Sequence, residues 1–86
     1  MTRVLTMQRT IVPHGERKRY LERLRLKRDH YKRANCRFWV FEESALPGAF
    51  LEFMEAESAD ALSAALTSAP DPVVDAGRVY QEVELS

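Results

Sequence analysis

The chain has 86 residues, which is enough for one small domain and too few for two. With 45% hydrophobic and 30% charged residues and a formal net charge of zero, it has the composition of a globular domain. No apolar run approaches the roughly 20 residues that span a bilayer, so we expect no membrane partner. Its single cysteine, Cys36, excludes an intrachain disulfide, and the first residues lack the apolar segment of a secretory signal, so we expect a cytoplasmic protein.

The first half of the chain predicts a strand followed by a basic helix. Residues 4–12 are rich in β-branched side chains and predict a strand, which ends at a Pro-His-Gly turn. Residues 16–33 contain neither glycine nor proline and predict a helix, which Asn35 closes in a left-handed conformation. The stripe of this helix expected to face the core consists of Arg17, Tyr20, Leu21, Leu24, Tyr31 and the stem of Arg28.

The second half predicts a hairpin, a short helix and a last strand. Residues 36–42 and 49–55 are apolar segments separated by a Pro-Gly turn, which favours two paired strands. Ser58 is an expected N-cap for an alanine-rich helix over residues 59–67. Residues 78–85 alternate between apolar and polar side chains and predict the final strand.

The order strand, helix, strand, strand, helix, strand predicts an α+β fold. It is the order of the ferredoxin-like βαββαβ arrangement, with a four-stranded antiparallel sheet and both helices on one face. Right-handed crossovers place the first and third strands in the centre, in the spatial order 4-1-3-2. We therefore expect a single ferredoxin-like domain over residues 1–86.

The strands carry apolar side chains on both faces, which is unusual for a sheet covered on one side. The segment Asn-Cys-Arg-Phe-Trp-Val-Phe at residues 35–41 has four large apolar residues in a row. The side chains expected toward the helices are Phe38, Val40, Leu51, Phe53, Val79 and Val83. Those expected on the other face are Trp39, Phe41, Phe50, Met54 and Tyr80. With the assignment inverted, the outer face is still apolar, so we expect a homodimer formed by sheet-on-sheet packing about a two-fold axis.

Three segments together resemble the dimeric α/β-barrel superfamily, in particular small proteins similar to antibiotic-biosynthesis monooxygenases: VPHGERKRYLERL, CRFWVFEE and PGAFLEFMEAESADAL. The resemblance implies a homodimer whose two sheets form a barrel and a small ligand held between sheet and helices. Some members oxidise polyketide-like aromatics without a cofactor, others degrade haem, and many have no known activity. A histidine often found after the family's second helix is absent from SAALTSAPDP. The implied function is binding of a small apolar or aromatic molecule, with cofactor-independent monooxygenation as its enzymatic form and no cofactor expected.

Four residues are candidates for acid–base catalysis. His14 at the first turn and His30 on the first helix are either general bases or surface histidines, and their spacing is not that of a metal site. Glu52 and Glu82 alternate with apolar residues on strands that both flank the first strand, where Arg9 lies. An Arg9–Glu52–Glu82 cluster is either a polar grip inside the barrel or a charge-paired rim. A one-residue change in the register of the first strand replaces Arg9 by Gln8 in this cluster.

Aromatic side chains are the candidates for ligand binding. Trp39, Phe41, Phe50 and Tyr80 make either a flat lining for a planar ligand, with Arg9 as its polar contact, or the core of the dimer. Cys36 follows a helix C-terminus, where a thiol is not activated, so we interpret it as a small core residue.

The charges are distributed unevenly along the chain. Residues 1–37 contain 12 Lys/Arg and 3 Asp/Glu, whereas residues 38–86 contain 1 Lys/Arg and 10 Asp/Glu. Two alternatives follow: the basic helix 16–33 binds nucleic acid or an acidic partner, or the charges neutralise each other within the fold or across a dimer. We favour the second, because a nucleic-acid-binding domain usually has a net positive charge as well as a basic patch, and this chain has a net charge of zero. The basic face also lacks the interleaved aromatic residues of a nucleic-acid stacking platform. A non-catalytic structural subunit is the remaining alternative.

Overall fold

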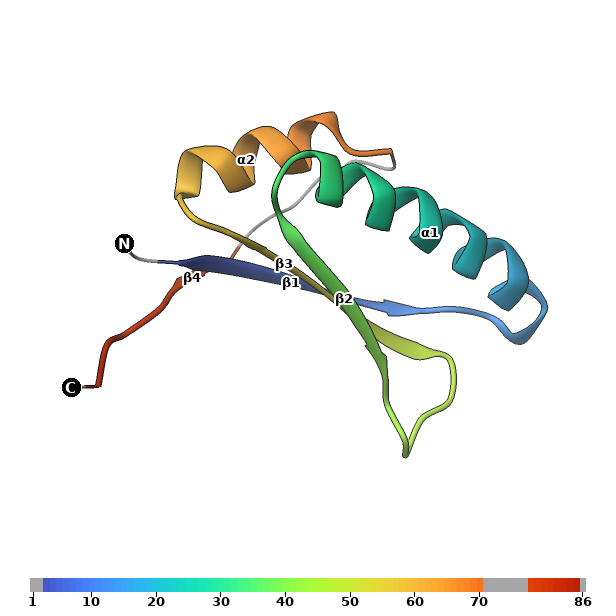
Figure 1. Cartoon of the computed structure of the whole chain (residues 1–86). Coiled ribbons are helices and arrows are strands. Elements are labelled where there is room, and N and C mark those ends of the chain that lie inside the picture. Colours follow the sequence, from blue (N-terminus) through green and yellow to red (C-terminus); the bar gives the residue numbers. More distant parts are fainter. Residues whose placement is uncertain (1–2, 71–77, 86) are drawn as a thin grey trace.

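The computed structural model describes residues 3–70 and 78–85, which form one antiparallel sheet with both helices on the same face (Figure 1). The elements in chain order are β1 (Val4–Ile11), the 3-10 turn η1 (His14–Glu16), α1 (Arg17–Arg33), β2 (Arg37–Glu42), β3 (Ala49–Ala56), α2 (Ala59–Ser68) and β4 (Val79–Gln81). The strand order is β2-β3-β1-β4, so the predicted central position of β1 and β3 is confirmed. The chain thus has an α+β fold with an open four-stranded sheet, compatible with a small ferredoxin-like fold.

The pairing of the strands fixes which side chains face the helices. Glu52 at the middle of β3 lies opposite Gln8 of β1 and Val40 of β2. This register places Phe50 and Met54 on the helix-covered face and Leu51 and Phe53 on the open face. The predicted facing of β3 was therefore wrong, while that of Phe38, Trp39, Val40 and Phe41 on β2 is confirmed. Because β3 carries large apolar residues on both sides, its periodicity alone does not select a face.

Two apolar clusters fill the space between sheet and helices. Under α2 lie buried residues of β1, β3, both helices and the α1–β2 turn: Val4, Tyr31, Cys36, Met54, Ala56, Leu62, Ala65, Leu66 and Ala69. Under the first half of α1 lie Val12, Tyr20, Leu24 and Phe50. The buried residues of α1 also include Lys27, which the sequence pattern assigned to the solvated side. Neither helix in the described part of the chain is long and apolar enough to cross a membrane.

Local sequence features set the ends of the helices and the hairpin. The Ser58 hydroxyl accepts a hydrogen bond from the Ala61 backbone N–H at 3.1 Å, as an N-cap does. Asn35 adopts the predicted left-handed conformation with φ of 58° after α1. Gly48 has φ of +98°, and a Cβ atom there would lie 2.9 Å from the Val12 carbonyl oxygen, so the close approach of the β2–β3 turn to β1 requires glycine.

The last strand is much shorter than predicted. Only Val79–Gln81 pair with β1, and the last backbone bond of this ladder runs from the Glu82 N–H to the Arg3 carbonyl. Beyond it, Val83 is 74% and Leu85 94% exposed. Figure 1 shows this segment leading away from the sheet on the side opposite the helices. The alternating pattern of residues 82–85 thus has no strand to pair with in the described part of the chain.

Candidate functional site

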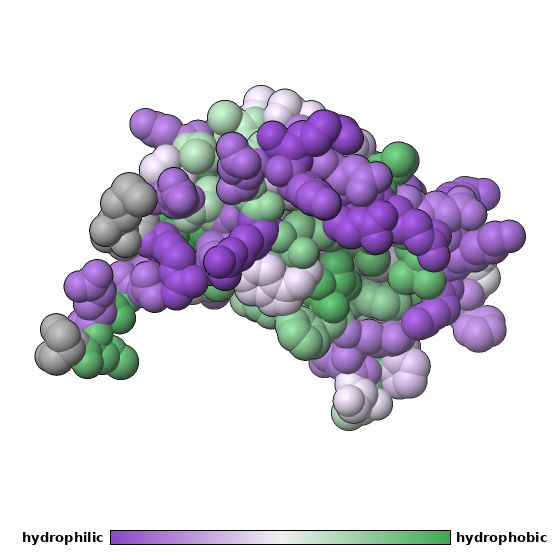
Figure 2. All heavy atoms as spheres, viewed as in Figure 1, coloured by the Kyte–Doolittle hydropathy of each residue, from purple (hydrophilic) through white to green (hydrophobic). Residues whose placement is uncertain are grey.

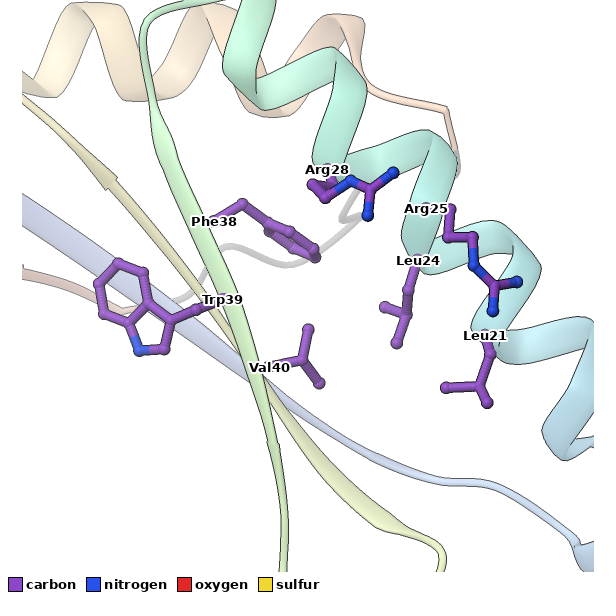
Figure 3. A pocket seen from close by; sticks show the side chains of 7 residues that line it. All are labelled: Leu21, Leu24, Arg25, Arg28, Phe38, Trp39 and Val40. Atoms are coloured by element: carbon purple, nitrogen blue, oxygen red, sulfur yellow. The ribbon is translucent and has the colours of Figure 1, made fainter.

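A groove lies between α1 and the edge strand β2 (Figure 3). Its volume is about 240 Å³, and its lining residues are Leu21, Leu24, Arg25, Arg28, Phe38, Trp39 and Val40. Figure 3 shows Phe38 and Val40 directed from β2 toward α1, with Leu21 and Leu24 directed from α1 toward the sheet. In Figure 2 the same region is a hollow with apolar side chains beneath the charged side chains of α1. We call this feature the α1–β2 groove.

The periodicities of the two elements explain how the α1–β2 groove forms. Residues 21, 24, 25 and 28 recur at spacings of three and four, so they share one side of α1. Phe38 and Val40 are two residues apart and point to the same face of β2. Because β2 is an edge strand, no further strand of the described chain covers this flank of the sheet. A binding site usually occupies about 300–1,000 Å³, so this groove suits a small ligand or part of a larger one.

The charges at the groove all come from α1. Leu21, Leu24, Phe38 and Val40 provide an apolar surface, and among the described residues only Arg25 and Arg28 are ionisable lining groups. Arg25 makes no ion pair with any other described residue, and Arg28 contacts only its neighbour Asp29, through Nε at 3.3 Å. The groove therefore combines an apolar floor with a positive edge.

Trp39 connects the groove to the open face of the sheet. Its indole stacks on the Phe53 ring at a centroid distance of 5.5 Å and an interplanar angle of 9°, and Phe41 meets the same Phe53 ring edge-on at 5.8 Å. Figure 3 shows Trp39 directed away from Phe38 and Val40, toward the other side of β2. A ligand in the groove and a partner on the open face would thus both contact Trp39 or its immediate surroundings.

A buried polar cluster lies beneath α1, next to the groove. The Glu52 carboxylate is 1% exposed and accepts hydrogen bonds from the Tyr20 hydroxyl at 2.8 Å and from Lys27 Nζ at 2.9 Å. Tyr20 and Lys27 are seven residues apart, two turns of α1, and so reach the same point of the sheet. Gln8 lies opposite Glu52 on β1, and its buried side-chain oxygen accepts no hydrogen bond from the described residues.

The surroundings of this cluster keep its tyrosine protonated. Burial, followed by the hydrogen bond to the Glu52 carboxylate, raises the pKa of Tyr20 well above its ordinary value near 10. Burial likewise raises the pKa of Tyr31, the next large side chain along α1, to about 12. A tyrosine that holds its proton and donates to a buried carboxylate satisfies that carboxylate but does not act as a base at neutral pH. The cluster therefore attaches α1 to β3.

The structure does not bring the four predicted catalytic residues together. His14 is exposed at η1 and lines a separate hollow of about 90 Å³ near Gly48. His30 faces α2, where its Nε2 lies 2.9 Å from the Ala65 carbonyl oxygen. Glu82 follows β4 and forms a two-bond ion pair with Arg3. Within the described residues, none of these three nor Glu52 lines the α1–β2 groove.

The Arg9–Glu52–Glu82 cluster does not form. Arg9 lies on the open face and pairs with Glu43 at 2.6 Å, whereas Glu52 is buried on the helix-covered face. The β1 residue that shares the face of Glu52 is Gln8, so the register differs by one residue from the one that the cluster needs.

The predicted ligand-binding residues are divided among three places. Trp39 lines the groove, Phe41 and Tyr80 are exposed on the open face, and Arg9 lies there as well. Phe50 lies under α1, 4.8 Å from the Tyr20 ring, with the Arg17 guanidinium 5.3 Å from its centroid. The sequence pattern did not identify the other groove residues as a site, although Leu21, Leu24 and Arg28 lay on the predicted core stripe. Whether the sheet covers this stripe of α1 or leaves it exposed in a groove depends on where β2 packs against the helix.

Two further kinds of site can be checked in the described residues, a metal site and a reactive thiol. No group of three or more His, Cys, Asp or Glu side chains among them could hold a metal ion. Cys36 is buried, and burial raises the pKa of its thiol, which disfavours the reactive thiolate. No protein-family model, curated protein or solved structure matches the chain.

Proposed function

We propose that this protein is a homodimer of the dimeric α/β-barrel type that binds a small apolar or aromatic molecule in the α1–β2 groove. The observation that supports ligand binding is the groove itself, a hollow of about 240 Å³ whose floor consists of leucine, valine and aromatic side chains. Apolar surface left in a hollow beside the Phe38 ring is a favourable environment for a flat, weakly polar molecule.

The open face of the sheet supports the homodimer. Its apolar side chains come from all four strands and comprise Leu5, Met7, Ile11, Trp39, Phe41, Leu51, Phe53 and Tyr80. Phe41 is 59% exposed and Met7 45%, and the helices lie on the opposite face. Soluble monomers rarely leave a continuous apolar surface of this kind uncovered.

A second copy of the chain is the simplest cover for this face. Two open faces related by a two-fold axis present the same apolar centre to each other. Charged residues of both signs border that centre, with Arg37 and Glu55 at one end and Arg9 and Glu43 at the other. Such a border is self-complementary, because a two-fold axis can bring an arginine of one copy near a glutamate of the other. The exposed apolar side chains beyond β4 add surface that a second copy would cover.

Oxygenation of the ligand without a cofactor stays a prediction from the family resemblance. His14, His30, Glu52 and Glu82 were predicted as its acid–base residues, and in the described chain they lie outside the groove. The proposal is therefore one of binding, with a non-catalytic structural subunit as its alternative.

Filling the groove tests the ligand half of the proposal. Leu21→Trp places a larger side chain in the groove from a half-buried position on α1, and Leu26→Trp makes the same change at a position of the helix that is 58% exposed and does not line the groove. We expect the wild-type protein and Leu26→Trp to bind the neutral probe naphthalene-2-carboxamide equally in isothermal titration calorimetry. We expect Leu21→Trp to bind it at least about tenfold more weakly, a loss of about 1.4 kcal/mol or more. Equal binding by all three proteins, or no binding by the wild type, would contradict the proposal.

A further inference from the structure

The two arginines at the groove suggest the chemical class of its ligand. We propose that the α1–β2 groove selects small aromatic or apolar acids, with Arg25 and Arg28 holding the carboxylate while the ring lies on the apolar floor. This inference rests on the proposed function and adds to it the charge of the ligand.

The geometry places both cations on the same side of α1. Arg25 and Arg28 are three residues apart and both line the groove, and Figure 3 shows their side chains lying alongside α1 on either side of Leu24. Leu24 of α1 and Phe38 of β2 line the same groove. A carboxylate at the edge could thus reach a guanidinium while its ring contacts Leu24, Phe38 and Val40.

Arg25 and Arg28 combine a place in the groove lining with the lack of an ion pair across the fold among the described residues. Four other arginines are paired with carboxylates from distant parts of the sequence: Arg3 with Glu82, Arg9 with Glu43, Arg17 with Glu42 and Arg37 with Glu55. Arg25 has no such partner among the described residues. Arg28 uses only its Nε on the adjacent Asp29, which leaves its two terminal nitrogens available. Within the described chain, two donor groups that lack a partner across the fold thus border a strongly apolar hollow.

Guanidinium groups are well suited to this role. The planar fork of an arginine donates two parallel hydrogen bonds to a carboxylate, which fixes the orientation of the ligand as well as its charge. No acidic residue in the described part of the chain lines the groove to compete for these donors. Since neighbouring cations repel, a bound anion would also relieve the repulsion between Arg25 and Arg28.

The test compares two probes that differ in charge and hardly in shape. Naphthalene-2-carboxylate is ionised at pH 7, and naphthalene-2-carboxamide is its neutral counterpart. We expect the wild-type protein to bind the carboxylate about fivefold more tightly in low salt, the preference that two partly exposed ion pairs provide. In 1 M NaCl, where the Debye length is about 3 Å, we expect the preference to shrink toward equality. Isothermal titration calorimetry measures both dissociation constants.

Matched double variants assign the preference to the groove. Arg25→Gln with Arg28→Gln should bind both probes with the affinity that the wild type has for the amide. Arg19→Gln with Arg33→Gln removes the same charge from exposed positions of α1 that do not line the groove, and should keep the roughly fivefold preference. Circular dichroism checks that both variants fold.

The outcomes separate this inference from the function on which it rests. Equal binding of both probes by the wild type, or equal loss of preference in the two double variants, overturns the selection for acids and leaves the groove as a site for neutral molecules. Failure of both probes to bind the wild-type protein overturns the ligand site and this inference together.

Discussion

The two faces of the sheet are both apolar, but residues 3–70 and 78–85 cover only one of them. On the helix-covered face, Met54 is 1% exposed and packs in a closed cluster with Tyr31 and Leu62. On the open face, Trp39 and Phe41 both contact the Phe53 ring without any cover from the helices. The Trp39–Phe53 stack is nevertheless as close to parallel as the Tyr31–Phe38 stack on the covered side. Since the side chains are similar, the difference lies in what packs on them. A sheet with two such faces predicts a second layer, and our proposal is that a second copy of the chain provides it.

The largest expected effect comes from the buried polar cluster on the covered face. Lys27→Met removes one partner and leaves the Glu52 carboxylate buried without its cation, which we expect to cost about 3–5 kcal/mol in the free energy of unfolding. Lys32→Met removes the same charge at an exposed position of α1 and should have little effect. Urea denaturation followed by circular dichroism at a fixed protein concentration measures both. A cost in Lys27→Met no larger than that in Lys32→Met would mean that the pair does not hold α1 on the sheet.

Adding Glu52→Gln to Lys27→Met sharpens this result. The double variant has no buried charge, and the amide oxygen of the introduced glutamine can still accept a hydrogen bond from the Tyr20 hydroxyl, so we expect it to regain part of the lost stability. A double variant less stable than Lys27→Met would contradict the explanation by an unpaired carboxylate.

The next effect compares one substitution on the two faces. Met54→Ala opens a cavity in the closed cluster, and we expect it to cost about 2–5 kcal/mol. Met7→Ala changes the same side chain on the open face and should cost clearly less in a protein diluted to the monomer, because Met7 is 45% exposed there. At high protein concentration its cost should rise, since a second copy would bury it. Equal costs at all concentrations would remove the distinction between the two faces.

The smallest effect concerns pH and comes from two tyrosines on the covered face. The folded state raises the pKa of Tyr31 to about 12 and that of Tyr20 in the same direction, above the unfolded value near 10. Between these values the unfolded chain loses protons that the folded chain keeps, so stability is fully present below about pH 10 and falls as pH rises above it. Tyr20→Phe should make the fall above about pH 10 less steep than in the wild type, because it removes one of the two tyrosines whose pKa the fold raises. Denaturation curves collected from about pH 8 to about pH 11 measure the slopes, and identical slopes in both proteins would contradict this cause.

The features set by local sequence were predictable and those set by packing were not. The capping serine, the left-handed asparagine, the strand order and most helix bounds follow from residue type and chain connectivity. Which side chains of β3 face the helices could not be predicted in this way, because large apolar side chains extend from β3 in both directions. Lys27 was missed since a lysine is rarely buried, and only the structure shows that the Glu52 carboxylate accepts a hydrogen bond from its Nζ.

The candidate site was less predictable than the fold. The aromatic residues of β2 stood out in the sequence, but Phe38 and Val40 were expected to be covered core and are instead half-buried in the groove lining. Arg25 looked like one more solvated charge on a basic helix, because the sequence does not show which side of α1 lies beside the edge strand. A groove arises where two elements diverge, and that depends on the relative position of α1 and β2.

The most direct test of the central claim is the mass of the protein in solution. Sedimentation velocity at micromolar concentration should give a particle of twice the 9.9 kDa chain mass for the wild type. Phe41→Lys, which places a charge among the apolar side chains of the open face, should shift it to a single chain without loss of helix signal in circular dichroism, whereas Leu26→Lys on the exposed side of α1 should remain a dimer. A wild-type protein that sediments at 9.9 kDa would contradict the claim that a second copy covers the open face.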